Sequence, residues 1–285
     1  MKESAIKAAT EYSGKQQNQR AALARQIWLL LGFYFLAFFA FAFFSQDTFS
    51  LWKPPSFDGS FSSLILPLLS ALLGAFIAIA IVFTVSKMRG AAQIHNRELL
   101  VFLGGGMLLD FVFNFAALKF SGGQSPSTPA EFGLTAIANL GVLASAIALG
   151  WLVARGLKKP SYLLTAAVVG ALTDIYSVYF GPSKQVLDSA VFPYVGFQWG
   201  VFGQGVIPCV GAGDFIFLCL FFIGIRRFKL DDRKTFWAMN AAFALGFLSL
   251  VLSPKGIPAL PFMAFLLLLV HGRELWKLQA TPEYS

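Results

Sequence analysis

The chain has 285 residues, of which 57% are hydrophobic and 13% are charged, and its mean hydropathy is +0.69. These values exclude an ordinary soluble domain and predict a polytopic membrane protein, because several apolar runs can cross about 30 Å of hydrocarbon at 1.5 Å per residue. The net charge of +8 fits membrane topology and attraction to anionic lipid. With no arginine-rich run or nucleic-acid motif, we expect no nucleic-acid partner.

Eight apolar runs predict eight spans in an all-α transmembrane bundle. They cover residues 27–44, 64–85, 99–118, 133–154, 161–181, 201–224, 235–253 and 259–271. The 32 phenylalanines and the lack of alternating apolar and polar residues favour helices over a β-barrel. The first run, of about 18 residues, is longer than a signal-peptide core, so we expect it to remain as an anchor.

The basic residues separate to one side of this eight-span map. Of the 22 Lys and Arg residues, all but four fall on the side of the two termini. The exceptions are Lys53, Lys119, Lys184 and Lys255. Because basic residues stay preferentially in the cytoplasm, we expect a multi-pass protein with both termini cytoplasmic, in the cell membrane if the chain is microbial. The map divides the chain into a polar segment 1–26, four-span halves 27–160 and 161–272, and a tail 273–285.

Two aspartates, Asp174 and Asp214, lie deep in apolar runs of the second half. A charged residue at the centre of a spanning helix costs roughly 2.5 to 3.5 kcal/mol, so such residues are usually functional. The two lie at about 20 and 15 Å from the cytoplasmic ends of antiparallel spans, at helical rise, and can face each other. The sequence therefore predicts a carboxylate pair that activates water, with two unrelated interhelical contacts as the alternative.

The stretch before Asp214 is unusually rich in glycine and contains Pro208. Glycines at Gly211 and Gly213 would let another backbone approach closely, and Pro208 would loosen the helix just before the carboxylate. A substrate backbone would then reach Asp214, although small-residue helix packing explains the same pattern.

The residues Gly211-Ala212-Gly213-Asp214 resemble the GxGD motif of the presenilin and signal peptide peptidase group of intramembrane aspartyl proteases. Pro258-Ala259-Leu260, followed by Pro261, is similar to the PAL motif of that group and closest to its presenilin version. A weaker match joins Asp174 and the segment 181–190 to the first catalytic aspartate of the family. Three ordered matches across 161–265 are more specific than a lone GxGD, which also occurs in prepilin peptidases.

The resemblance implies that Asp174 and Asp214 form the catalytic dyad and that Pro258, Ala259 and Leu260 shape the site or dock the substrate. Two adjacent carboxylates share one proton, so one acts as general base on water while the other donates to the scissile carbonyl and the leaving amine. This chemistry needs no covalent intermediate, cofactor or metal.

The expected substrates are transmembrane helices or remnant signal peptides in the lipid bilayer. A substrate helix must unwind before water can attack it, and pairing with an enzyme strand would satisfy its freed backbone groups. The 258–261 segment is a candidate docking site for the unwound substrate, although it also fits a simple turn at the start of the last span. The short loops favour a compact enzyme that works alone, and the sequence identifies no accessory subunit.

The chain departs from the family pattern in two respects. Thr173 stands where the family usually has Tyr before its first aspartate, which predicts weak or altered activity. Eight spans replace the family's nine, as if the first were lost, which leaves Asp174 on an outward-running helix. That orientation resembles the signal peptide peptidases and implies substrates with cytoplasmic N-termini.

Other proteolytic chemistries find little support in the sequence. HExxH and GxSxG motifs are absent, and we expect His95 and His271 to lie in basic cytoplasmic segments away from any metal or nucleophile. Cys209 and Cys219 are expected on one apolar helix, ten residues apart, where they cannot form a disulfide with each other.

A third intramembrane carboxylate, Asp110, has Asn114 one helical turn later. With Asp174 and Asp214 it could define a proton-coupled transporter, although the halves show no clear inverted repeat. The simpler interpretation of Asp110 is a hydrogen bond to Asn114 or to a neighbouring Ser or Thr. A catalytically silent relative that only binds transmembrane helices is a further alternative.

Overall fold

The computed structural model describes residues 2–44, 61–87, 95–122, 126, 128–181, 196–201, 205–252 and 258–281. These residues form eight α-helices and one two-stranded antiparallel sheet. In chain order the elements are α1 (Lys2–Phe44), α2 (Phe61–Ser86), α3 (Asn96–Phe120), α4 (Pro129–Ala154), α5 (Pro160–Phe180), β1 (Gly196–Val201), β2 (Gly205–Gly211), α7 (Ala212–Arg227), α8 (Asp232–Leu252) and α9 (Ala259–Gln279).

Six helices are long and apolar enough to cross a membrane: α1 through its segment Ala21–Ala42, α2 through Pro67–Ser86, and the whole of α3, α4, α5 and α9. The protein is thus a multi-pass integral membrane protein, and the predicted polytopic helical bundle is confirmed at this level. The 16 residues of α7 extend about 24 Å at helical rise, which is less than the hydrocarbon core. Helix α8 begins with the charged residues Asp232, Arg233 and Lys234.

The prediction of one continuous helix over 201–224 is wrong. Residues 205–211 form strand β2, and α7 begins only at Ala212. The physical reason is local, because Pro208 cannot donate a helical hydrogen bond and glycine is a poor helix former, whereas the valines and isoleucine of this stretch favour a strand. Strand β1 is buried along its whole length, which is the condition under which non-helical backbone is tolerated at membrane depth.

Three further expectations from the sequence differ from the structure. Residues 196–200, which fall between the predicted spans 161–181 and 201–224, belong to the buried strand β1, while 182–195 lie outside the described residues. Cys209 lies in β2 and Cys219 in α7, so they do not share a helix, and both are free thiols. His271 is buried within α9 and contacts Thr235 and Glu274, so it does not lie in an exposed cytoplasmic segment.

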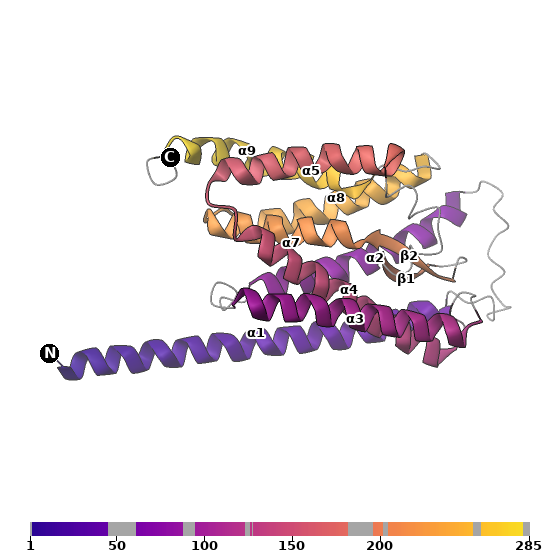
Figure 1. The fold of residues 1–285 in the computed structure, drawn as a ribbon, viewed down its shortest axis with the longest axis horizontal. Helices are drawn as coiled ribbons and strands as arrows, with labels where there is room; N and C mark the ends of the chain where they lie inside the picture. The colour runs from indigo at the N-terminus through magenta and orange to yellow at the C-terminus, as the bar shows by residue number, and fades with distance from the viewer. Residues whose placement is uncertain are drawn as a thin grey trace.

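The helices lie along one common axis (Figure 1). Helices α5 and α9 pack together on one side of the bundle, α3 and α1 lie on the opposite side, and α7 and α4 run between them. The start of α1, the end of α9 and the connections α4–α5 and α7–α8 lie at the same end, whereas the hairpin β1–β2 lies toward the other end.

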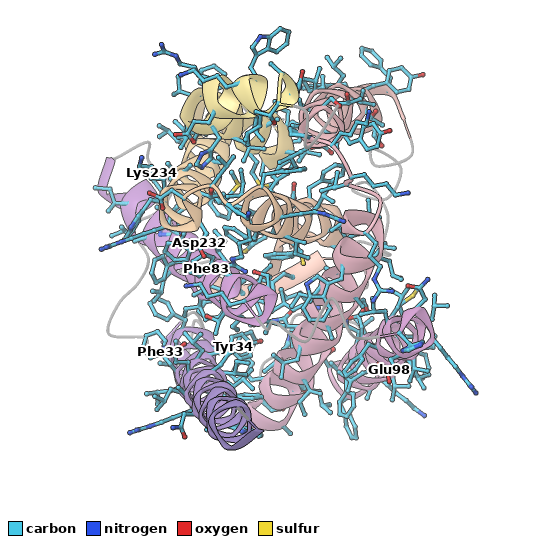
Figure 2. All side chains as sticks on the ribbon, turned by 90° about the vertical axis from the view of Figure 1, so that its left-hand side faces the viewer. Phe33, Tyr34, Phe83, Glu98, Asp232 and Lys234 are labelled. Atoms are coloured by element: carbon cyan, nitrogen blue, oxygen red, sulfur yellow. The ribbon has the colours of Figure 1, made fainter. Side chains whose placement is uncertain are left out.

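Arg226, in the last turn of α7, ties three helices together at the end where the termini lie. Its guanidinium pairs with Asp232 at 3.0 Å and donates to Ser86 Oγ at 2.7 Å. It also lies over the Phe83 ring, 4.8 Å from the ring centroid. Figure 2, which looks along the bundle from this end, shows Phe83 of α2 beside Asp232 of α8.

Aromatic side chains fill the core around the hairpin. Trp199 of β1 is fully buried and contacts Phe38 of α1 and Phe197, with ring centroids 5.5 and 6.1 Å away. Phe197 in turn meets Phe215 at the start of α7, with 5.6 Å between centroids. The hairpin is therefore part of the core that positions α7.

Candidate active site

Asp174 lies in the second half of α5, a helix that begins at Pro160, where proline costs no hydrogen bond. Its carboxylate is half-buried and is hydrogen-bonded to the backbone N–H of Leu260. Within the described part of the chain, its Oδ2 atom is buried and has no hydrogen-bond partner. Asp174 thus presents a buried carboxylate oxygen that no described group occupies.

Asp214 lies in the first turn of α7, three residues after the N-cap Gly211. Its carboxylate is hydrogen-bonded to the backbone of Gly211, as the acidic side chain in a capping box reaches back to the N-cap amide. The GxGD sequence therefore has a local structural meaning, since the aspartate binds the N-terminus of its own helix. The positive end of the helix dipole favours a carboxylate there.

The PAL segment forms the start of α9. Pro258 is the N-cap of this helix, and Leu260 is its second residue. The first N–H groups of a helix have no partner inside the helix, and Asp174 of α5 takes the one of Leu260. Ala259 instead faces α8, because its Cβ atom would lie 3.6 Å from a Cβ atom added at Gly246.

Asp174 lies close enough to Asp214 to act on it electrostatically. Beside them α5 crosses α7 at Gly170, where an added Cβ atom would lie 2.6 Å from Cε1 of Phe217. Gly170 is one helical turn before Asp174, and Phe217 is three residues after Asp214. Glycine at position 170 therefore permits the close approach of α5 and α7 beside the two aspartates.

The structure thus brings together three segments that are distant in sequence: Asp174, the Gly211 to Asp214 turn and Leu260. Gly213 is exposed, and a Cβ atom added to it would meet nothing within 4 Å, so open space lies beside Gly213, the residue before Asp214. Neither Gly211 nor Gly213 has a positive φ, so neither glycine is required by backbone conformation. The absence of side chains there leaves the backbone accessible.

Asp110 lies elsewhere in the bundle. Its carboxylate accepts a 2.6 Å hydrogen bond from Asn114 Nδ2 on the same helix, α3. Helices α3 and α5 lie on opposite sides of the bundle, with α4 and α7 between them (Figure 1). The arrangement therefore separates Asp110 from the helix that carries Asp174.

A buried polar group that the sequence did not predict connects Asn114 to β1. Gln198 Nε2 donates to Asn114 Oδ1 at 2.7 Å, and the Gln198 main chain binds the side chain of Asn139 in α4. The available signal was the presence of Asn139 and Gln198 in apolar surroundings, where amides need partners. Among the described residues, no group of three or more His, Cys, Asp or Glu side chains could hold a metal ion.

Comparisons with known proteins identified no relative of this chain. No protein-family model, no curated protein and no solved structure matches this chain.

Proposed function

We propose that the protein is an intramembrane aspartyl endopeptidase that hydrolyses peptide bonds within transmembrane segments or remnant signal peptides. The observation that carries the proposal is the meeting of Asp174, Asp214 and the Leu260 amide. These residues belong to the three segments whose sequences resemble the presenilin and signal peptide peptidase group. Unrelated polar contacts give no reason for all three to converge.

In the proposed reaction the two carboxylates share one proton. The ionised carboxylate takes a proton from water, and the resulting hydroxide adds to the scissile carbonyl while the protonated carboxylic acid hydrogen-bonds its oxygen. Transfer of a proton to the nitrogen then releases the amine and leaves a new carboxyl end. The unoccupied Oδ2 of Asp174 and the open space at Gly213 support room for water and a substrate backbone.

The proposal extends to the topology. It treats α7 and α8 as the sixth and seventh of eight spans, in a presenilin-like fold without the family's first span, and it places both termini in the cytoplasm. Helix α5 then runs outward, as in signal peptide peptidases, and the enzyme takes substrates with cytoplasmic N-termini. Strand β2, which leads directly into α7, offers backbone close to Asp214 for an unwound substrate.

The test is cleavage of single-span substrates of both orientations by the purified protein in lipid vesicles, with products identified by mass spectrometry. We expect cleavage of substrates with cytoplasmic N-termini and its loss in Asp174→Ala and in Asp214→Ala. Cleavage of the opposite orientation alone would overturn the proposed topology. A folded protein that cuts neither class would overturn the protease proposal and favour transport or helix binding.

A further inference from the structure

A continuous chain of hydrogen bonds crosses the apolar core from α3 to α1 through β1. Asn114 Nδ2 donates to Asp110, Gln198 Nε2 donates to Asn114, Asn139 binds the Gln198 backbone, and Asn139 Nδ2 donates to Tyr34 Oη at 3.1 Å. The Tyr34 hydroxyl completes the chain by donating to Ala136 O at 3.1 Å. Figure 2 shows Tyr34 directed inward from α1, whereas Phe33 beside it points outward.

The central link is the pair formed by Asn139 and the main chain of Gln198. Asn139 Oδ1 accepts from the Gln198 N–H at 2.8 Å, and Asn139 Nδ2 donates to the Gln198 carbonyl at 2.7 Å. A backbone N–H only donates and a backbone carbonyl only accepts, so the orientation of the Asn139 amide is fixed. With its second N–H on Tyr34, Asn139 uses both of its donor hydrogens, although it is only 1% exposed.

This pairing explains the local geometry of the hairpin. The N–H and C=O of one strand residue point to the same side, and in Gln198 both point to α4, away from β2. The residue opposite Gln198 in the sheet is Pro208, which has no N–H and is tolerated where the ladder needs none. The Asn139 side chain thus takes the place of a third strand at this edge of β1.

The hairpin contacts the first turn of α7, so its position affects the position of Asp214. Gly211 pairs with Gly196 at one end of the sheet and is also the N-cap of α7 and the backbone partner of Asp214. Phe197, next to Gln198, packs against Phe215, next to Asp214. A shift of β1 therefore moves both the backbone and the side chain that locate the first turn of α7.

From this geometry we infer that Asn139 is a positioning residue: by holding the Gln198 main chain, it fixes the hairpin and the Asp214-bearing first turn of α7. The geometric part stands on the contacts alone, and its consequence for catalysis rests on the proposed function. Asn139 touches neither carboxylate in any described contact, so it acts through β1 and β2.

The test compares Asn139→Leu with Asn240→Leu, both in the full-length protein in lipid nanodiscs. Asn240 makes the matched control, since its amide donates to Phe236 O within its own helix α8. Hydrogen exchange is followed in residues 196–201 and 205–217. Loss of the two bonds to Gln198 should speed exchange in these segments about 30-fold, with α9 unchanged and with no such change in Asn240→Leu.

A second measurement reads the aspartate pair itself. The probe is a substrate peptide whose scissile amide is replaced by a hydroxyethylene group, a mimic of the tetrahedral state that aspartyl proteases stabilise. Its Kd should rise about tenfold in Asn139→Leu and stay within about twofold in Asn240→Leu. Irreversibly unfolded protein would lower the number of binding sites but leave Kd unchanged, and a reversible equilibrium would need only about a tenth of the protein folded to raise the apparent Kd tenfold. A tenfold rise in Kd for a variant that is folded by its unfolding temperature therefore reports positioning.

Two results would overturn the inference: wild-type exchange rates at 205–217 in Asn139→Leu, or an equal rise in every helix. An unchanged Kd with a loosened hairpin would overturn its catalytic consequence. If the wild-type protein neither binds the mimic nor cleaves any substrate, the proposed function fails, while the exchange experiment still decides whether Asn139 holds the hairpin.

Discussion

The crossing of α5 and α7 at Gly170 should control the separation of the two aspartates. A Cβ atom at this position would lie 2.6 Å from Cε1 and 2.8 Å from Cζ of Phe217. Carbon atoms pack at about 3.5 to 4.0 Å, so Gly170→Ala requires the ring, or α5 itself, to move by about 1 Å. Overpacking of this kind costs about 1–3 kcal/mol, and a misplacement of about 1 Å between reacting groups can reduce the rate about 100-fold.

The assay measures thermal unfolding and peptide cleavage in lipid for Gly170→Ala, Phe217→Leu and the double variant. Leucine lacks the two ring atoms that meet the new methyl group, so Phe217→Leu should restore much of both losses. Gly104→Ala serves as the control, because nothing lies within 4 Å of its added Cβ atom, and alanine should stabilise that helix by up to about 1 kcal/mol. If the effects of Gly170→Ala and Phe217→Leu add to within about 0.5 kcal/mol, the reasoning from this contact is wrong.

Two further predictions concern carboxylates away from the dyad. Asp110→Asn retains an acceptor for Asn114 and should keep near-normal cleavage, whereas Asp110→Leu removes the acceptor of the Asn114 Nδ2 hydrogen bond and should lower the unfolding temperature. Complete loss of activity in Asp110→Asn would instead favour proton transport. The exposed Asp231 accepts bonds from the backbone N–H groups of Lys234 and Arg233 at 3.1 and 3.0 Å, and these bonds, that of Lys234 foremost, lower its pKa. Because the folded-state pKa is below the unfolded value, the stabilisation is complete above the unfolded pKa and is lost as pH falls through the folded pKa. The protection factor for hydrogen exchange at the start of α8, which is the intrinsic exchange rate at each pH divided by the observed rate, should therefore fall in acid, and in Asp231→Ala it should be low at every pH. A wild-type protection factor that does not change with pH would contradict this.

The helical bundle could be predicted from the sequence because hydropathy reports directly on transfer into lipid. The runs that became α2, α3, α4 and α5 were long, apolar and bounded by charge, so their type and approximate position were determined locally. The nearness of Asp174 and Asp214 was also accessible, since two carboxylates at similar depth on successive spans carry a cost that demands a reason.

The hairpin could not be predicted in the same way. The stretch from Val206 to Val210 is as apolar as a spanning helix, and hydropathy alone does not distinguish a short buried strand from a helix. Its strand form depends on β1, which arrives from across an intervening segment, and on Asn139 in another helix. The role of Gln198 is likewise a tertiary property, because no local pattern indicates which distant amide will bind its backbone.

The partnership between Asp174 and Leu260 illustrates the same limit at the candidate site. The family resemblance singled out both residues, but the contact itself arises because α5 packs on α9 and thereby brings a carboxylate to the open N-terminus of that helix. Ala259, from the same motif, faces Gly246 of α8 instead. Helix packing therefore gives neighbouring motif residues different surroundings.

The most direct test of the central claim is the cleavage rate of a substrate span with a cytoplasmic N-terminus, measured for the wild type, Asp174→Asn and Asp214→Asn in the same lipid. Asparagine preserves size and hydrogen bonding but cannot exchange the proton, so each substitution should lower the rate by at least about 10²-fold to 10⁴-fold while the unfolding temperature is maintained. Cleavage that persists in either folded variant would contradict a reaction carried by the aspartate pair.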